Sequence, residues 1–240
     1  TDSKEIKQLV LDSIAKNESI LLTYFNQHCF NIYNEDQTYQ QILDTKFKAY
    51  HADLGVFFAI KFLEDKKKVK KIDATALNEV IINELVKNKI PLVLVGGNFE
   101  PEFIQDEANQ RGINLVGYQH GYFQESQTDD VIQYLISMNT KIFFVAMGVP
   151  RQELFAVKLS EVSGSFVVIC VGNFLEFYFG TKKRASVFIQ KIGLEWIFRM
   201  AIEPKRLWKR YLIGIPKFII RILKIKFTKK KINEISVFLD

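Results

Sequence analysis

A regular alternation of short apolar runs with amphipathic stretches constrains this chain more than any other feature. The apolar runs lie at residues 91–95, 113–117, 141–146 and 165–171, and segments of helical periodicity separate them. Strands that are apolar on both faces and alternate with helices are typical of a parallel sheet covered by helices on both sides. The sequence therefore predicts an α/β protein built on such a sheet.

The flanking parts of the chain extend this pattern. Before the alternation, the spacing predicts helices and strands at 3–16 (helix), 19–25 (strand), 36–45 (helix), 46–50 (strand) and 56–64 (helix). From about residue 185 onward only helices are expected, and Pro216 should break the segment 205–227 into two pieces. We therefore expect a Rossmann-like α/β domain over residues 1–192 and a helical, basic appendage over residues 193–240.

Charge is distributed unevenly along the chain. Residues 181–240 hold 16 Lys and Arg against 4 Asp and Glu, a net charge of +12, whereas residues 1–180 hold 17 against 23, a net charge of −6. This asymmetry indicates an anionic partner for the C-terminal part, such as a membrane surface, a nucleic acid or a phosphorylated ligand. Within 205–227 cations alternate with bulky apolar groups, as in a helix that lies in a headgroup layer, a solvated core helix or a partner-binding helix.

Composition excludes several classes of protein. With 48% apolar and 25% charged residues the chain should fold, and no apolar run is long enough to predict a transmembrane helix. The two cysteines are too few for a disulfide framework, which favours a reducing, cytoplasmic compartment. The three histidines lack metal-ligand spacing, so neither a metal site nor a cofactor is expected.

Loops that follow the predicted strands carry the candidate binding residues, because ligands of such sheets bind beyond the carboxyl ends of the strands. The Gly96-Gly97-Asn98 turn could bring backbone N–H groups to a phosphate, or it could simply connect two elements. His120 could donate to a phosphate or hold its own loop. Each of these residues is therefore a candidate phosphate-binding residue whose role could instead be purely structural.

Two further segments offer polar side chains at the same edge. Gly148 permits a tight turn before a helix that begins with Arg151, Gln152 and Glu153. The glutamine and glutamate could bind a uracil or ribose edge, or they could be exposed residues of a capped helix. Asp53 precedes helix 56–64, where a carboxylate could act as a general base or cap the helix.

A series of motifs resembles one known family. The series consists of residues 117–123 (GYQHGYF), 148–153 (GVPRQE), 171–177 (VGNFLEF) with Gly180, 184–185 (RA), 193–196 (GLEW) with Arg199, and 203–211 (EPKRLWKRY). In order and spacing it is similar to the WecG/TagA/CpsF glycosyltransferases, glycosyltransferase family 26. The resemblance covers roughly residues 20–214 and is most specific in its C-terminal half.

The resemblance implies a UDP-sugar-dependent hexosyltransferase of polysaccharide biosynthesis that inverts the anomeric centre and needs no metal. The donor would carry an N-acetylmannosamine-type sugar or a related hexose, and the acceptor would be a sugar on undecaprenyl diphosphate, a polyprenyl carrier. The enzyme would be peripheral on the cytoplasmic face of the bacterial membrane, anchored by its appendage at the inner leaflet. A homo-oligomer is left open, and no nucleic-acid partner is expected.

The motifs show which residues of this chain correspond to the functional residues of the family. The general base falls on Asp53 and an asparagine of the first strand falls on Asn26. The appendage arginines fall on Arg199, Arg206 and Arg210, and an acidic donor-site residue falls on Glu176. The chain departs from the usual pattern at three of these motifs, with Tyr24 in place of threonine, Leu54 in place of glycine and Glu176 in place of aspartate.

Two other functions compete with this interpretation. A nucleotide-binding Rossmann oxidoreductase would share the sheet, but the Gly-x-Gly-x-x-Gly fingerprint is missing from the sequence. A basic-tail nucleic-acid-binding module would use the cations of the C-terminal segment, yet the sequence holds no known DNA- or RNA-binding motif. Affinity for NAD, or salt-sensitive binding of single strands without affinity for UDP, would distinguish these alternatives from the transferase.

Overall fold

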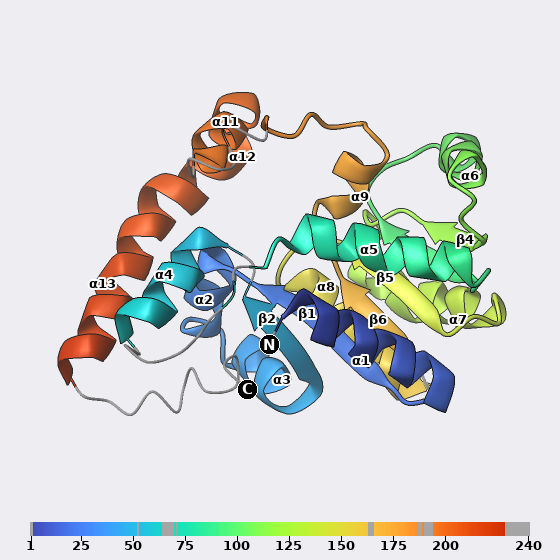
Figure 1. Ribbon diagram of the computed structural model, residues 1–240, viewed down its shortest axis with the longest axis horizontal. Coiled ribbons are helices and arrows are strands. Elements are labelled where there is room, and N and C mark those ends of the chain that lie inside the picture. Colours follow the sequence, from blue (N-terminus) through green and yellow to red (C-terminus); the bar gives the residue numbers. More distant parts are fainter. Residues whose placement is uncertain are drawn as a thin grey trace.

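The centre of the protein is a single sheet of parallel strands (Figure 1). The computed structural model describes residues 2–51, 53–63, 70, 72–162, 166–186, 189 and 194–228. Its six strands follow the order β2-β1-β6-β5-β3-β4. In chain order they are β1 (Ile20–Phe25), β2 (Phe47–His51), β3 (Leu92–Gly96), β4 (Leu115–Gln119), β5 (Ile142–Ala146) and β6 (Val167–Cys170). The predicted Rossmann-like α/β class is confirmed.

Helices cover both faces of this sheet. One face packs against α1 (Ser3–Lys16), α5 (Ala74–Lys87) and α6 (Pro101–Gln110). The opposite face packs against α3 (Gln37–Lys46), α7 (Thr128–Ser137) and α8 (Arg151–Val162), with the short 3-10 turn η1 (Glu125–Gln127) ahead of α7. Because both faces are covered, every residue of β3 and β6 is buried, which explains the continuous apolar runs in the sequence.

The order of the strands creates a crevice between β1 and its neighbour β6. The helix after β1, α2 (Gln27–Tyr33), contributes Cys29 and Phe30 to the core on one face. The helix after β6, α9 (Phe174–Tyr178), contributes Phe174 and Leu175 to the core on the other face. Chain segments that leave adjacent strands toward opposite faces leave an opening at the carboxyl edge, where ligands of α/β proteins bind.

Short polar side chains fix the start of the helices near this edge. Asn26 caps α2, because its Oδ1 accepts hydrogen bonds from the N–H groups of His28 and Cys29. Asp73 caps α5 in the same way through the N–H groups of Thr75 and Ala76. Such caps satisfy N–H groups that have no partner within the helix. They also hold the capping side chains at the edge of the sheet.

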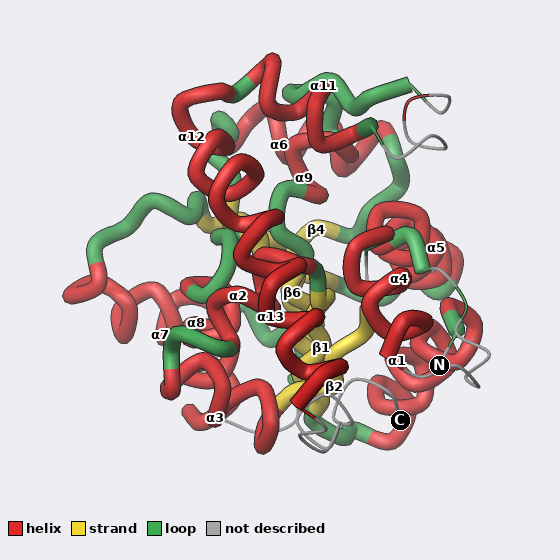
Figure 2. The backbone as a smooth tube through the Cα atoms, turned by 90° about the vertical axis from the view of Figure 1, so that its left-hand side faces the viewer, coloured by secondary structure: helices red, strands yellow, loops and turns green. Residues whose placement is uncertain are grey.

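The C-terminal helices run along one side of the α/β domain. They are α11 (Glu195–Ile202), α12 (Pro204–Trp208), the π-helical turn η2 (Lys209–Ile213) and α13 (Gly214–Thr228). In both overall views α13 lies beside α2 and α4 (Leu54–Leu63) (Figures 1 and 2). The expected boundary between residues 192 and 193 lies outside the described residues.

Pro216 does not break the C-terminal helix as expected. It lies in the first turn of α13, directly after the π-helical turn η2. A proline ring clashes with the carbonyl of the residue four positions earlier, and a local widening of the helix relieves that clash. The helical path therefore continues through residues 204–228, with a π turn where a break was predicted.

Polar and apolar contacts hold α13 on the domain. The Phe218 ring packs edge-on against Phe30, with ring centroids 5.2 Å apart. The Asn31 side chain donates to the carbonyl of Gly214 at 2.7 Å and accepts from Arg221 at 2.9 Å. Phe218 and Ile222 are consequently part of the same core as β1 and α2.

Two local features differ from the sequence-based expectation. Helix α2 was not predicted, because its seven residues (QHCFNIY) are too few to display a clear apolar period. Strand β4 spans Leu115–Gln119, two residues later than expected, so its carboxyl end lies immediately before His120. The remaining predicted strands lie within two residues of their observed positions.

Candidate active site

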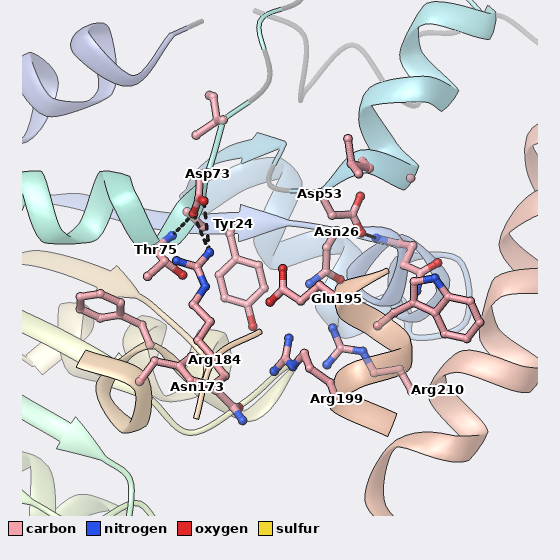
Figure 3. Close-up of a pocket in the computed structure, with 18 of the residues that line it drawn as sticks. Tyr24, Asn26, Asp53, Asp73, Thr75, Asn173, Arg184, Glu195, Arg199 and Arg210 are labelled. Atoms are coloured by element: carbon pink, nitrogen blue, oxygen red, sulfur yellow. Dashed lines mark hydrogen bonds and ion pairs between the residues drawn. The ribbon is translucent and has the colours of Figure 1, made fainter. Parts of the chain in front are cut away.

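A cavity of about 420 Å³ opens beyond the carboxyl ends of β1, β2 and β6. The C-terminal helices close it from the other side through Glu195, Arg199 and Arg210 (Figure 3). The α/β domain contributes the polar wall residues Tyr24, Asn26, Gln27, Asp53, Asp73, Thr75, Asn78, Asn173 and Arg184. The two parts of the chain therefore complete one site.

Asp53 lies between the starts of two helices. Its Oδ2 accepts a hydrogen bond from the backbone N–H of Gln27 at 3.0 Å, and its Oδ1 accepts one from Val56 at 2.7 Å. Burial raises the pKa of Asp53, while these N–H donors and the charge of Arg210 oppose the rise. The capping role weighed for Asp53 is thus observed, and the same contacts hold a more basic carboxylate on the cavity wall.

Asn26 connects the same region to β1. Its Oδ1 caps α2 by accepting from the N–H groups of His28 and Cys29 at 2.9 and 3.0 Å. Figure 3 places the Asn26 side chain beside Asp53 on the wall of the cavity. The structure therefore brings these two sequence-predicted residues together, one after β1 and one after β2.

Two appendage arginines line the opposite wall. The Arg199 guanidinium lies over the Phe177 ring at 5.4 Å from its centroid. The Arg210 guanidinium lies 5.7 Å from the centroid of Tyr211, and its buried Nε has no hydrogen-bond partner within the described residues. Figure 3 shows both guanidinium groups pointing toward the middle of the site. Cations and a basic carboxylate consequently share one cavity.

Arg206 and Glu176, which were also expected at the site, do not line this cavity. Arg206 forms an ion pair with Glu203. Glu176 pairs with Lys182 at 2.7 Å, and the same lysine reaches Glu203 at 2.9 Å. Together these contacts link α9 to the junction of α11 and α12, so both residues have a structural role in the positions observed.

Gln152 and Glu153 differ most from their expected position. Both side chains are completely buried, because the first turn of α8 faces β1 and the loop after β6. Glu153 Oε1 accepts from the Thr23 hydroxyl and from Gln152 Nε2, each at 2.8 Å, and Gln152 Oε1 accepts from the N–H of Gly172 at 3.0 Å. Burial raises the pKa of Glu153 to about 7. The pair lies beneath the site and does not form its wall.

The remaining predicted donor-site residues lie at a neighbouring part of the same edge. They lie at or after the carboxyl ends of β3, β4 and β5 and do not line the cavity. These residues are Gly96, Gly97, Asn98, His120, Gly148 and Arg151. The glycine turns pack tightly, since a Cβ on Gly121 would lie 3.0 Å from the Cα of Gly96. His120 Nδ1 accepts from the N–H of Tyr122 at 3.2 Å, which supports the loop-holding alternative for this histidine.

Arg151 has local partners at this part of the edge. Its guanidinium lies 4.9 Å from the centroid of the Phe123 ring and donates to the carbonyl of the same residue. The side chain thereby fixes the loop after β4 to the start of α8. Among the described residues, no three His, Cys, Asp or Glu side chains gather closely enough to hold a metal ion.

At the far end of the cavity, sequence reasoning gave Arg184 no role beyond its place in a family motif, and it missed Asp73 and Asn78. Arg184 donates to both carboxylate oxygens of Asp73 at 3.1 and 3.2 Å, a contact between positions 111 residues apart. Asn78 did leave a signal in the sequence. It occupies the first position of an apolar stripe completed by Ile81, Ile82 and Leu85, where a polar residue is unexpected. A polar residue at such a position of a helix indicates a buried side-chain amide.

The comparison with known families agrees with these observations. The model of the glycosyl transferase WecG/TagA/CpsF family matches residues 1–232, nearly the whole chain. The match is longer than the resemblance seen over residues 20–214, and it includes both the α/β domain and the C-terminal helices that close the cavity. It favours a transferase over the oxidoreductase and nucleic-acid-binding alternatives. The chain therefore belongs to the WecG/TagA/CpsF family of glycosyltransferases, which act in cell-surface polysaccharide synthesis.

Proposed function

We propose that this protein is an inverting glycosyltransferase that moves a hexose or N-acetylated amino sugar from a UDP-sugar to a sugar on a polyprenyl diphosphate. One observation carries the proposal. The carboxylate of Asp53 and the guanidinium groups of Arg199 and Arg210 line the same cavity at the carboxyl edge of the sheet. A base and two cations are the groups that a metal-independent displacement of a nucleoside diphosphate requires.

The proposed reaction is a single displacement. Asp53 takes the proton of the acceptor hydroxyl while that oxygen forms a bond to the anomeric carbon, and the bond from this carbon to the UDP oxygen breaks. Burial raises the pKa of Asp53, which makes it a stronger base than an exposed aspartate. The hydrogen bonds from Gln27 and Val56 fix its orientation throughout.

The two arginines stabilise the leaving group. Negative charge grows on the diphosphate as the bond to the sugar breaks, and Arg199 and Arg210 supply positive charge in a partly enclosed site. Among the described residues the buried Nε of Arg210 has no partner, so it is available to donate to an oxygen of this kind. Arg206 contributes less, because Glu203 already neutralises it.

The outward side of α13 supports a role at a membrane surface. Phe218 and Ile222 pack inward, whereas the side chains of Ile219, Ile220, Leu223 and Phe227 are exposed to solvent, with Phe227 at 78%. Lys224 is also exposed. An exposed apolar stripe with cations at its border is typical of helices that rest in the interface of a bilayer. A lipid-linked acceptor would be reached from that position.

The described helices do not include one that is long and apolar enough to cross a membrane. The proposed attachment is through the outward face of α13, because apolar side chains are exposed there. Phe218 and Ile222 belong to the domain core, so deleting the C-terminal segment would expose that core and confuse loss of attachment with loss of folding. Substitutions confined to the exposed face are the better test.

Calorimetric titration with UDP tests the proposed donor, with NAD as the control. Micromolar binding of UDP without binding of NAD is the expected result, and it does not depend on the identity of the sugar. Arg210→Gln and Arg199→Gln should weaken UDP binding by about tenfold each, whereas Arg206→Gln should change it little. Absence of UDP binding, with and without lipid present, would overturn the proposed donor.

A further inference from the structure

A group of charged side chains joins α9 to the C-terminal helices. Lys182 Nζ lies 2.7 Å from Glu176 Oε2 and 2.9 Å from Glu203 Oε1, an arrangement we call the Lys182 bridge. Glu203 also forms an ion pair with Arg206, so two acids and two cations leave the group without net charge. The side chains of Lys182 and its two partners are each less than a third exposed. Solvent and salt therefore screen these ion pairs only in part.

The backbone that carries Lys182 is held on the α/β domain. The N–H of Lys182 donates to the carbonyl of Glu176 at 3.0 Å, and the Thr181 hydroxyl donates to the same oxygen at 3.1 Å. Helix α9 itself is anchored by Phe174 and Leu175, which belong to the core. The ammonium group of Lys182 therefore connects the C-terminal helices to an anchored part of the domain.

Helix α11 has little apolar burial to fix its position. None of the residues that form it, Glu195–Ile202, is buried, whereas α13 contributes Phe218 and Ile222 to the core. Burial of apolar side chains thus holds α13 on the domain and contributes much less at α11. A polar contact that ties α11 to the domain consequently has a larger share in fixing where this helix lies.

The Lys182 bridge lies one helical turn away from a residue of the site. Glu203 follows Arg199 by four positions, and its N–H donates to the Arg199 carbonyl at 3.0 Å. The Arg199 guanidinium lies over the ring of Phe177, which is next to Glu176 on α9, and points toward the middle of the cavity (Figure 3). Neighbouring residues of α9 thus contact both ends of this turn of α11. A displaced turn would carry Arg199 away from its place, and binding sites tolerate such displacements poorly.

We propose that Lys182 is a positioning residue of the transfer reaction, an inference that rests on the proposed function. By bridging Glu176 and Glu203, it holds α11 across the cavity so that Arg199 faces the diphosphate of the donor. Lys182 does not line the cavity, and this role requires no contact with the substrate. Because Lys182 acts through Arg199, its loss cannot weaken UDP binding more than the loss of Arg199 itself.

The positive charge of Lys182 offers an alternative explanation that a second variant separates. A lysine near an anion-binding site can raise the affinity through its electric field alone, without holding any helix. If the field alone mattered, Glu203→Gln would strengthen UDP binding, because the region would become more positive. If the bridge matters, Glu203→Gln weakens UDP binding, because one of the two carboxylates that Lys182 joins is lost. The two explanations predict opposite signs.

The experiment combines calorimetric titration of the full chain with UDP and amide hydrogen exchange without ligand. It compares wild type with Lys182→Met, with Lys182→Arg, which keeps the charge, and with Glu203→Gln. Lys7→Met is the matched control, because Lys7 pairs with Glu84 at 3.3 Å between α1 and α5, and its side chain is 28% exposed against 31% for Lys182. Thermal unfolding checks that each variant is folded.

We expect Lys182→Met and Glu203→Gln to weaken UDP binding by about three- to tenfold, whereas Lys182→Arg and Lys7→Met should remain within about twofold of wild type. Arg199→Gln should cost about threefold or less in the Lys182→Met background, against about tenfold in wild type, because the bridge acts through this arginine. Amide exchange of α11 should be faster in Lys182→Met and Glu203→Gln, while exchange of α6 stays unchanged. Lys7→Met should leave exchange of α11 as in wild type.

Three results would overturn the role of Lys182. Unchanged exchange of α11 in Lys182→Met would show that the bridge does not hold this helix. Faster exchange with unchanged UDP affinity would leave Lys182 with a structural role only. Stronger UDP binding by Glu203→Gln would assign the effect to charge alone. If wild type does not bind UDP, the proposed donor itself fails, and exchange of α11 then decides whether Lys182 holds this helix.

Discussion

The carboxylate of Asp53 accepts a hydrogen bond from the backbone N–H of Gln27 at 3.0 Å, a contact between the residues that follow β2 and β1. Together with the bond from Val56, it places Asp53 between the starts of α2 and α4. One side chain thus fixes the geometry of the site and supplies its candidate base. Stability and activity are coupled at this position.

Substitution of Asp53 by asparagine should lower both the turnover rate and the free energy of unfolding. Turnover should fall by about 10²- to 10⁴-fold, because a general base is lost. The free energy of unfolding should fall by about 1–2 kcal/mol, since the new NH₂ group opposes one of the two backbone N–H donors. Steady-state kinetics and chemical denaturation measure the two effects separately.

Asp36→Asn provides the control for Asp53. Asp36 caps α3 by accepting from the N–H of Tyr39 at 3.0 Å, and it does not line the cavity. Asparagine can keep this single hydrogen bond through its own Oδ1, so the variant should retain stability to within about 0.5 kcal/mol and should retain turnover. Near wild-type turnover in Asp53→Asn would remove Asp53 from the reaction.

Glu153 should make stability depend on pH near neutrality. Its pKa is about 7 in the folded protein because of burial, against an ordinary value of 4.5. The folded state therefore holds the proton more tightly, and the contribution is fully present below about pH 4.5 and is lost as pH rises through 7. The full effect is roughly 3 kcal/mol.

The measurement for Glu153 is denaturant unfolding of wild type and Glu153→Gln between pH 4.5 and 8. Glutamine keeps the size of the side chain and does not titrate, so its stability should decline less over this range. Glu102→Gln, at an exposed position of α6, should behave as wild type does. Parallel curves for wild type and Glu153→Gln would contradict the raised pKa.

The exposed face of α13 should control attachment to lipid. Combined substitution of Ile220, Leu223 and Phe227 by glutamine should reduce binding to anionic vesicles by at least about 100-fold, since each apolar side chain contributes on the order of 1–2 kcal/mol. The fold should persist, because these side chains are exposed in the structure. Vesicle co-sedimentation measures the loss of lipid binding, and thermal unfolding checks that the variant is folded.

Equivalent substitutions elsewhere give the control for α13. Val80, Tyr134 and Val162 are exposed to a similar degree on α5, α7 and α8, and changing them to glutamine should leave vesicle binding intact. Retained binding by the α13 variant would place the lipid contact on another surface. A wild-type dimer in the absence of lipid that the α13 variant abolishes would assign this face to a second copy of the chain.

The effects of substitutions at Gly172 and Tyr24 on the free energy of unfolding should depend on each other. A Cβ on Gly172 would lie 2.5 Å from the Tyr24 hydroxyl oxygen, and Gly172 has a φ of +58°. Gly172→Ala should cost about 2–3 kcal/mol in the free energy of unfolding, and about 1 kcal/mol less in a Tyr24→Phe background. Gly180→Ala isolates the backbone contribution, because Gly180 has a φ of +74° with open space around it. Equal costs in both backgrounds would refute the contact.

The alternation of apolar runs with amphipathic segments was sufficient to predict the sheet and its strands, because strands buried on both faces produce continuous apolar runs in the sequence. It could not predict the order of the strands. Asn26, Asp53 and Asn173 meet at one cavity because β1 lies between β2 and β6. No local pattern in the sequence predicts this arrangement. Asp53 was a candidate from its position before a helix, whereas Asn26 was identified only through the resemblance to a family.

Side-chain polarity was a poor guide to exposure at the start of α8. Gln152 and Glu153 were expected to face a ligand, yet both are buried among partners distant in sequence, including Thr23 and Gly172. A buried hydrogen-bond network of this kind depends on tertiary contacts and leaves no local signal. Asn78 is the opposite case, because its place in an apolar stripe was readable without a structure.

Glu35 has a consequence for the type of membrane this protein would favour. Its carboxylate pairs with Lys217 at 2.7 Å and with Arg221 at 2.8 Å, so the domain offsets one of the two positive charges that these residues of α13 carry. The proposed membrane contact of α13 would then depend on apolar side chains more than on acidic lipids. A relative without an acid at position 35 would carry one more unit of net positive charge on this face and would bind more tightly to bilayers rich in anionic headgroups.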